Sequence, residues 1–119
     1  MRVRLKLTRI EMKGVATLVQ NCCNALSGED FLSVQYRDAL GGLLLKLAAR
    51  VPTLKNKNSL GLTEMESLAL YEVLNDLVDK MPPLEMGVGY TVLAEIDRQR
   101  SSHVSLMRAN LTSNNLLTR

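Results

Sequence analysis

Residues 5–11 read Leu-Lys-Leu-Thr-Arg-Ile-Glu, and residues 60–66 read Leu-Gly-Leu-Thr-Glu-Met-Glu. In both stretches a threonine is followed three residues later by a glutamate, which is the capping box that starts a helix. In the first stretch, apolar residues also alternate with basic ones, and alternation is the period of an extended strand. We therefore predict an extended segment over residues 2–7, a helix from Arg9 and another helix from Glu64.

The repeated pattern, at a separation of 55 residues, has two interpretations. In the first, it is simply a good helix start that the chain uses twice, since capping is favourable wherever a helix begins. In the second, the chain is a duplicated helical hairpin, in which Val34-Gln35-Tyr36 is echoed by Val88-Gly89-Tyr90. Under the duplication, residues 3–7 and 59–63 could pair as two short strands, because each would otherwise leave backbone groups unpaired. The first interpretation is favoured.

Apolar residues at helical spacing predict four helices in all. The first three cover residues 9–26, 30–51 and 64–80, and a glycine or a proline follows each of them and ends it. The fourth helix is the least distinct. Val92, Leu93 and Ile96 form a short helical stripe there, whereas two glycines just before them, Gly87 and Gly89, predict a loop or a frayed start.

Two features in the middle of the chain lead to further expectations. Gly41 and Gly42 lie inside the second predicted helix, where each glycine costs about 1 kcal/mol relative to alanine. Either another helix crosses closely at this point or the helix breaks, and the close crossing is favoured. Residues 53–61 are polar, and we expect them to form a mobile loop.

These elements together predict an all-α protein. The expected architecture is a four-helix bundle, either simple or built from two repeated helical hairpins, with a short extended N-terminal segment. The 119 residues, 46% of them apolar, suit one helical domain, which we place at residues 1–110. Residues 111–119 are rich in polar side chains, and we expect a disordered C-terminal tail there.

No stretch of the sequence has the length that a membrane span needs. The longest apolar run covers residues 39–45, against a requirement of about 18 residues. The basic N-terminus is followed by too short an apolar stretch for a signal peptide. The two cysteines, Cys22 and Cys23, are neighbours that rarely bridge each other, so a reducing compartment fits. We expect a cytoplasmic protein with no membrane partner.

No group of residues has the spacing of a catalytic, cofactor or metal site. His103 has serine neighbours but no recognisable third group to orient it. Cys22 and Cys23 are too few for a zinc site, and we expect Cys22 in the core and Cys23 at its edge. The carboxylates of the third predicted helix, such as Glu72 and Asp76, are interpreted as a solvated face. We predict a protein that is not an enzyme and uses no cofactor.

The second predicted helix carries more apolar surface than a monomer of this size easily hides. Its apolar face is wider than a single stripe, and the chain contains six methionines. Such surface is typical of subunit or partner contacts. The leading hypothesis is therefore a non-enzymatic protein–protein interaction or assembly module, acting as a homodimer or with another protein. Its interface residues would be Leu40, Leu43, Leu44 and Leu47.

The charge distribution supports an alternative hypothesis, a nucleic-acid-binding accessory protein. The net charge is only +3, but basic residues gather at 2–13 and 46–57, and acidic residues gather at 64–85. Nucleic-acid binding needs basic groups on one face, because neutralising phosphates supplies most of the affinity. Against it, the aromatic content of 3% leaves few platforms for stacking single-stranded bases. The candidate binding residues are Arg2, Arg4, Lys6, Arg9, Lys55 and Lys57.

Overall fold

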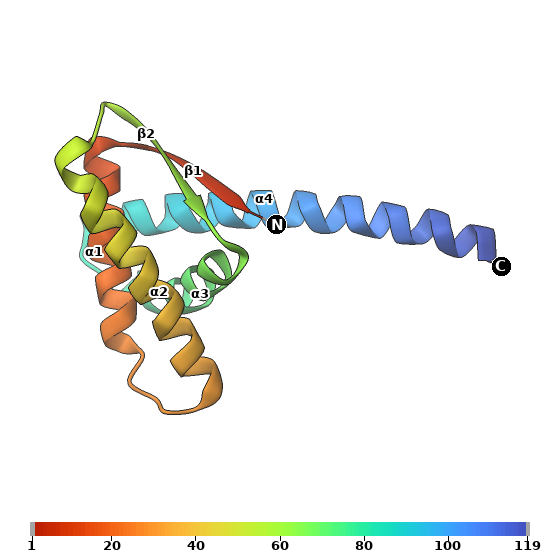
Figure 1. Cartoon of the computed structure of the whole chain (residues 1–119), viewed down its shortest axis with the longest axis horizontal. Coiled ribbons are helices and arrows are strands. Elements are labelled where there is room, and N and C mark those ends of the chain that lie inside the picture. Colours follow the sequence, from red (N-terminus) through yellow and green to blue (C-terminus); the bar gives the residue numbers. More distant parts are fainter. Residues whose placement is uncertain (1, 119) are drawn as a thin grey trace.

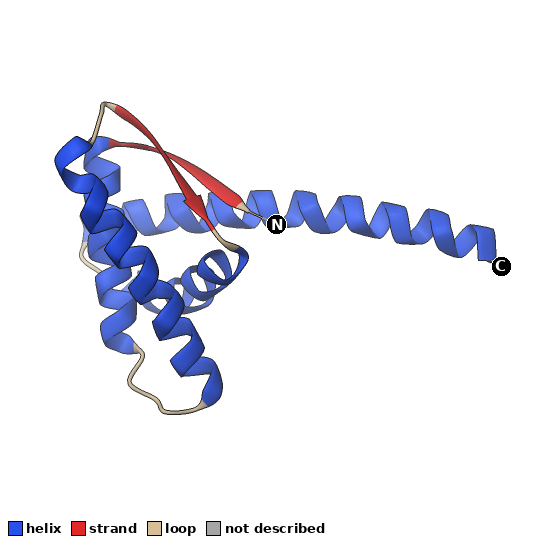
Figure 2. Ribbon diagram, in the orientation of Figure 1, coloured by secondary structure: helices blue, strands red, loops and turns tan. Residues whose placement is uncertain are grey.

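Two short strands, distant in the sequence, pair in the computed structural model, which describes the backbone of residues 2–118 and the side chains of residues 2–101. β1 (Val3–Thr8) and β2 (Lys57–Leu62) form an antiparallel two-stranded sheet, which we call the ribbon. Leu5 lies opposite Leu60. The extended N-terminal segment is confirmed, but the purely helical class is corrected, because a sheet lies on one side of the helices (Figure 2).

Helices make up most of the chain, as predicted. Within residues 2–118 the α-helices are α1 (Arg9–Ala25), α2 (Phe31–Arg50), α3 (Glu64–Leu77) and α4 (Pro83–Thr118), and two short 3₁₀ helices are η1 (Val51–Thr53) and η2 (Val78–Lys80). α1 contacts the three other α-helices, and α3 also packs against α2 and α4. The second half of α4 extends well beyond the rest of the molecule (Figure 1).

Both predicted capping boxes are present and fix where α1 and α3 begin. The Glu11 amide donates to Thr8 Oγ1 at 3.2 Å, and the Thr8 amide donates to Glu11 Oε1 at 2.9 Å. The corresponding distances between Glu66 and Thr63 are 3.1 and 2.8 Å. Each strand therefore leads directly into a helix, so that the ribbon is tied to the helical layer at two points.

Neither outcome predicted for Gly41 and Gly42, a close helix crossing or a break in the helix, is found in α2. α2 is continuous from Phe31 to Arg50, so the helix does not break. A Cβ atom built at Gly41 or Gly42 would meet nothing within 4 Å, so no helix crosses closely there. Both glycines lie on a part of α2 that faces open space, and the packing of the leucines on the opposite side keeps the helix intact.

Close helix contacts occur at other glycines. A Cβ at Gly14 of α1 would lie 3.3 Å from Val88 of α4, and one at Gly89 would lie 2.9 Å from Val78 of η2. The loop or frayed start predicted near Gly87 and Gly89 is wrong, because α4 begins at Pro83 and continues through both residues. Packing on α1 and η2 outweighs the low helix propensity of glycine in this stretch.

The polar stretch 53–61, predicted to be a mobile loop, mostly belongs to η1 and β2. The Asn58 side chain organises the approach to β2. Its amide nitrogen donates to the Lys55 carbonyl at 2.8 Å and to the Leu7 carbonyl at 3.4 Å, and its oxygen accepts from the Lys55 amide at 3.0 Å. The polar residues that suggested a loop thus bind the chain to β1.

The predictions for the cysteines and the C-terminal segment have different outcomes. Cys22 is buried in the core and Cys23 lies at its edge, as expected, and burial raises the pKa of the Cys22 thiol to about 12.

The backbone of residues 111–118 belongs to α4, but the side chains of residues 102–119 lie outside the described part. The predictions of a tail at 111–119 and of a surface His103 therefore stay predictions.

Candidate nucleic-acid interface

The ribbon has one buried face and one exposed face, because side chains alternate along each strand. The alternate apolar residues of β1 are buried, as are Leu60 and Leu62 of β2. The exposed face is built from the pairs Arg4–Gly61, Lys6–Ser59 and Thr8–Lys57. It therefore presents long basic side chains of β1 beside the small residues of β2.

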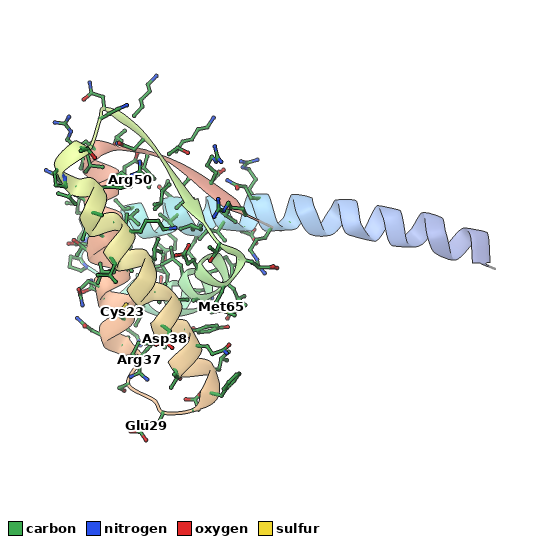
Figure 3. The ribbon with its side chains drawn as sticks, viewed as in Figure 1. Cys23, Glu29, Arg37, Asp38, Arg50 and Met65 are labelled. Carbon is green, nitrogen blue, oxygen red and sulfur yellow. The ribbon has the colours of Figure 1, made fainter. Side chains whose placement is uncertain are left out.

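The other three predicted basic residues lie at the ends of the ribbon. Arg2 directly precedes β1. Arg9 is the first residue of α1, and its guanidinium donates to the Leu54 carbonyl at 2.9 Å, which holds Arg9 beside the approach to β2. Lys55 is in that approach, two residues before β2. Nitrogen-tipped side chains are visible along the ribbon in Figure 3.

The structure thus brings together basic residues from two distant segments. All six predicted residues are exposed, and all six lie on the ribbon or at its ends. A strand of this length extends about 20 Å at about 3.3 Å per residue. The condition that the sequence set for nucleic-acid binding was basic groups of both segments on one face. The strand register places Arg4, Lys6 and Lys57 on the exposed face of the ribbon, whereas Arg2, Arg9 and Lys55 lie at its ends.

Two basic residues of the 46–57 segment have a structural role. Lys46 Nζ donates to the Gly61 carbonyl at 2.9 Å and forms an ion pair with Glu66 at 3.1 Å. Arg50 Nη1 donates to the Ser59 carbonyl at 2.7 Å. These bonds engage two carbonyls on the outer edge of β2 and join it to α2. Free strand edges otherwise invite pairing with another chain.

The outer edge of β1 is covered by α4 in the same way. Gln99 accepts from the Arg4 amide at 2.9 Å and donates to the Arg4 carbonyl at 2.8 Å. Hydrogen bonds from Arg98 and Gln99 lower the pKa of Glu95 to about 2, so this carboxylate is ionised at neutral pH. Beside it lies a groove of about 760 Å³, lined in part by Arg4, Lys6 and Arg98.

Sequence reasoning missed Arg98 and Gln99, because the contact of α4 with β1 joins residues 95 positions apart. The only available signal was the basic composition of residues 98–119, which has no acidic member. The groove places one more basic side chain, Arg98, next to those of β1. It also places the Glu95 carboxylate there, which lowers the positive potential at this edge of the ribbon.

The predicted interface leucines of α2 do not form a free surface. Leu40, Leu43 and Leu47 are buried in the core of the chain itself, and Leu44 is half-buried against it. They are covered because α2 packs between α1 and α3 and uses its wide apolar face for both. The exposed apolar residues of α2 are different ones, with Phe31 78% exposed and Leu45 74% exposed.

Among the side chains described, up to residue 101, no three histidine, cysteine, aspartate or glutamate residues form a cluster that could hold a metal ion. The acidic residues of α3 and η2, including Glu72, Asp76 and Asp79, are exposed. Within the same part of the chain, no helix is both long and apolar enough to cross a membrane.

No family model matches the chain, and no curated protein or solved structure matches it either. A functional assignment therefore depends on the geometry and charge of the chain's own surface. On the ribbon, this geometry brings exposed basic residues of two separate segments together.

Proposed function

We propose that the protein binds nucleic acid through the exposed face of the ribbon, mainly by contacts with phosphates. The observation that carries this proposal is the pairing of β1 with β2, which joins two basic segments about fifty residues apart into one exposed surface. Basic side chains at this density attract a polyanion because binding releases its condensed counterions. Opposite Arg4 and Lys6, β2 carries only the small residues Gly61 and Ser59, so no long side chain of β2 stands between these cations and a phosphate.

The proposed target is a duplex. Residues 2–9 and 55–62 contain no aromatic residue that could stack on an unpaired base. A two-stranded ribbon has dimensions that a major groove can accept. Because the proposed contacts are mainly with phosphates, which carry no sequence information, we expect binding with weak sequence preference, at the micromolar level or weaker near physiological salt.

Fluorescence anisotropy with labelled duplex DNA and labelled RNA, at about 50 and about 200 mM salt, tests the proposal. We expect duplex binding that weakens steeply between the two salt concentrations. Lys6→Ala and Lys57→Ala should each weaken it several-fold, because each removes one phosphate contact. Lys80→Ala is the matched control, since Lys80 is an exposed lysine of η2 outside the ribbon.

The outcomes separate the hypotheses. No binding at about 50 mM salt would contradict the proposal. Equal losses for Lys6→Ala, Lys57→Ala and Lys80→Ala would show that net charge alone, rather than the ribbon, attracts the nucleic acid. Circular dichroism of each variant checks that the fold is retained.

The second candidate function is the interaction or assembly module, as a homodimer or with another protein. The exposure of large apolar side chains on α2, Phe31 and Leu45 above all, favours it. Large apolar side chains left exposed are candidates for contact with another protein surface. Light scattering over a range of concentrations tests it, because a chain that stays monomeric at high concentration would contradict a homodimer.

A repeated hairpin is also part of what we propose. The residues that the 55-residue pattern equates, Leu5 and Leu60, lie opposite each other in the ribbon. Each half also supplies a helix that covers the strand of the other half, since Arg50 of α2 bonds to β2 and Gln99 of α4 bonds to β1. Cytoplasmic location remains an expectation from the sequence.

A further inference from the structure

An apolar groove is lined by residues of α1, α2 and α3 and by Leu26, which follows α1. Its volume is about 390 Å³. The apolar part of its lining comprises Ala25, Leu26, Leu32, Tyr36, Val73 and Leu77. Leu32 is 53% exposed at this groove, and its neighbour Phe31, on the same first turn of α2, is the most exposed large apolar side chain described.

The α3 side of this groove is acidic. Glu72 and Asp76 line it, one helical turn apart on α3, and both are exposed. No basic residue belongs to the lining. An apolar floor with carboxylates along one side fits an amphipathic helix that combines apolar residues with basic ones. The groove has none of the residues of the ribbon, so it is a separate surface.

The chain itself contains a helix of that chemistry. α4 continues to Thr118, and its second half leaves the body of the molecule and extends alone (Figure 1). Within residues 102–118, the sequence of the second half of α4 contains Arg108 and His103 but no acidic residue. In the sequence, Val104, Met107 and Leu111 follow the i, i+3, i+7 spacing of a helix that binds in a groove.

We propose that the acidic groove of one copy binds the second half of α4 from a second copy. The carboxylates of Glu72 and Asp76 attract the basic helix, and the apolar floor buries its apolar residues. The occupant is a second copy because α4 carries its second half away from the body of its own chain (Figure 1). The proposal does not depend on nucleic-acid binding, because it uses different residues.

Sedimentation equilibrium of the full chain without nucleic acid measures the self-association. The wild type should associate, and the double variant Glu72→Lys/Asp76→Lys should raise the dissociation constant at least about tenfold, because like charges then meet. Arg108→Glu should weaken association in the same direction. Asp38→Lys is the matched control, since Asp38 is an exposed acidic residue of α2 outside this groove.

A charge exchange makes the test specific. In an equimolar mixture of the groove variant and the Arg108→Glu variant, every groove can again find a helix of opposite charge, so association should return. A monomeric wild type would overturn the proposal. A wild type that associates, with a groove variant that behaves like Asp38→Lys, would overturn it as well, because a different surface would then join the copies.

Discussion

The two halves of the chain, β1–α1–α2 and β2–α3–α4, have the same order of elements but differ in the residues that their strands expose. Each half has a strand with alternate buried apolar residues, followed by a threonine-capped helix and a second helix. On the exposed face of the ribbon, β1 presents Arg4 and Lys6, whereas β2 presents Ser59 and Gly61 opposite them. Packing fixes the inward residues in both halves. The outward residues are free to differ, and on β1 they carry charge.

The caps of the two halves show the same contrast. Glu11 and Glu66 hold equivalent positions and make the same bond to the amide of the capping threonine. Glu66 is also buried, at 8% exposure, and forms the ion pair with Lys46, whereas Glu11 is half-buried. The glutamate of the pattern therefore only caps α1 in the first half. In the second half it caps α3 and also links α3 to Lys46 of α2, which bonds to β2.

The largest expected effect tests whether the halves are equivalent in the core. Leu5→Ala and Leu60→Ala should each lower the free energy of unfolding by about 2–5 kcal/mol, because both leucines are fully buried and face each other across the ribbon. Urea denaturation measures this. Lys6→Ala, on the exposed face, should stay within about 0.5 kcal/mol of the wild type. A small loss for only one leucine would mean that the two strands contribute unequally to the free energy of unfolding.

A smaller effect distinguishes the caps. Glu11→Gln should cost well under 1 kcal/mol, because glutamine can also complete a capping box. Glu66→Gln should cost about 1 kcal/mol, because it also removes the negative charge that faces the Lys46 ammonium, which keeps its bond to the Gly61 carbonyl.

A double-mutant cycle with Lys46→Met isolates the ion pair from the cap. If the coupling between Glu66 and Lys46 is zero in urea denaturation, the two glutamates have the same role and the comparison of the caps fails.

The smallest effect concerns the glycines of α2 and α4. Gly41→Ala should raise the free energy of unfolding by about 0.5–1 kcal/mol, since its Cβ meets nothing and the helix propensity improves. Gly89→Ala gains the same propensity but places a Cβ at 2.9 Å from the buried Val78, and overpacking costs about 1–3 kcal/mol. The net result should be a loss.

Gly87→Ala is the control on the same helix, because its Cβ also meets open space. It should behave like Gly41→Ala. Thermal unfolding of the three variants checks the order, and a stabilised Gly89→Ala would show that Val78 moves aside at little cost.

Local chemistry explains what could be predicted. The caps at Thr8 and Thr63 and the extended start depend on residues close in sequence, and they were predicted correctly. The six basic candidates were identified from composition, but their gathering depends on a strand pairing between distant segments.

The failures also have a common cause. The mobile loop expected over residues 53–61 was wrong because most of this polar stretch pairs with β1, an outcome that only the duplicated-hairpin interpretation allowed. α4 stays helical through Gly87 and Gly89 because it packs on α1 and η2. Lys46 and Arg50 donate hydrogen bonds to carbonyls on the outer edge of β2. The strand pairing alone left a signal, since the duplicated-hairpin interpretation allowed residues 3–7 to pair with 59–63, whereas the contacts of α4, Lys46 and Arg50 left none.

The salt dependence of duplex binding tests the central claim most directly. For phosphate contacts, the slope of log K against log salt is about −0.9 per contact. The triple variant Arg4→Gln/Lys6→Gln/Lys57→Gln removes three exposed cations of the ribbon without touching its core. We predict that its slope is smaller in magnitude than that of the wild type by about 3. A triple variant that binds the duplex with the wild-type affinity and slope would contradict the account.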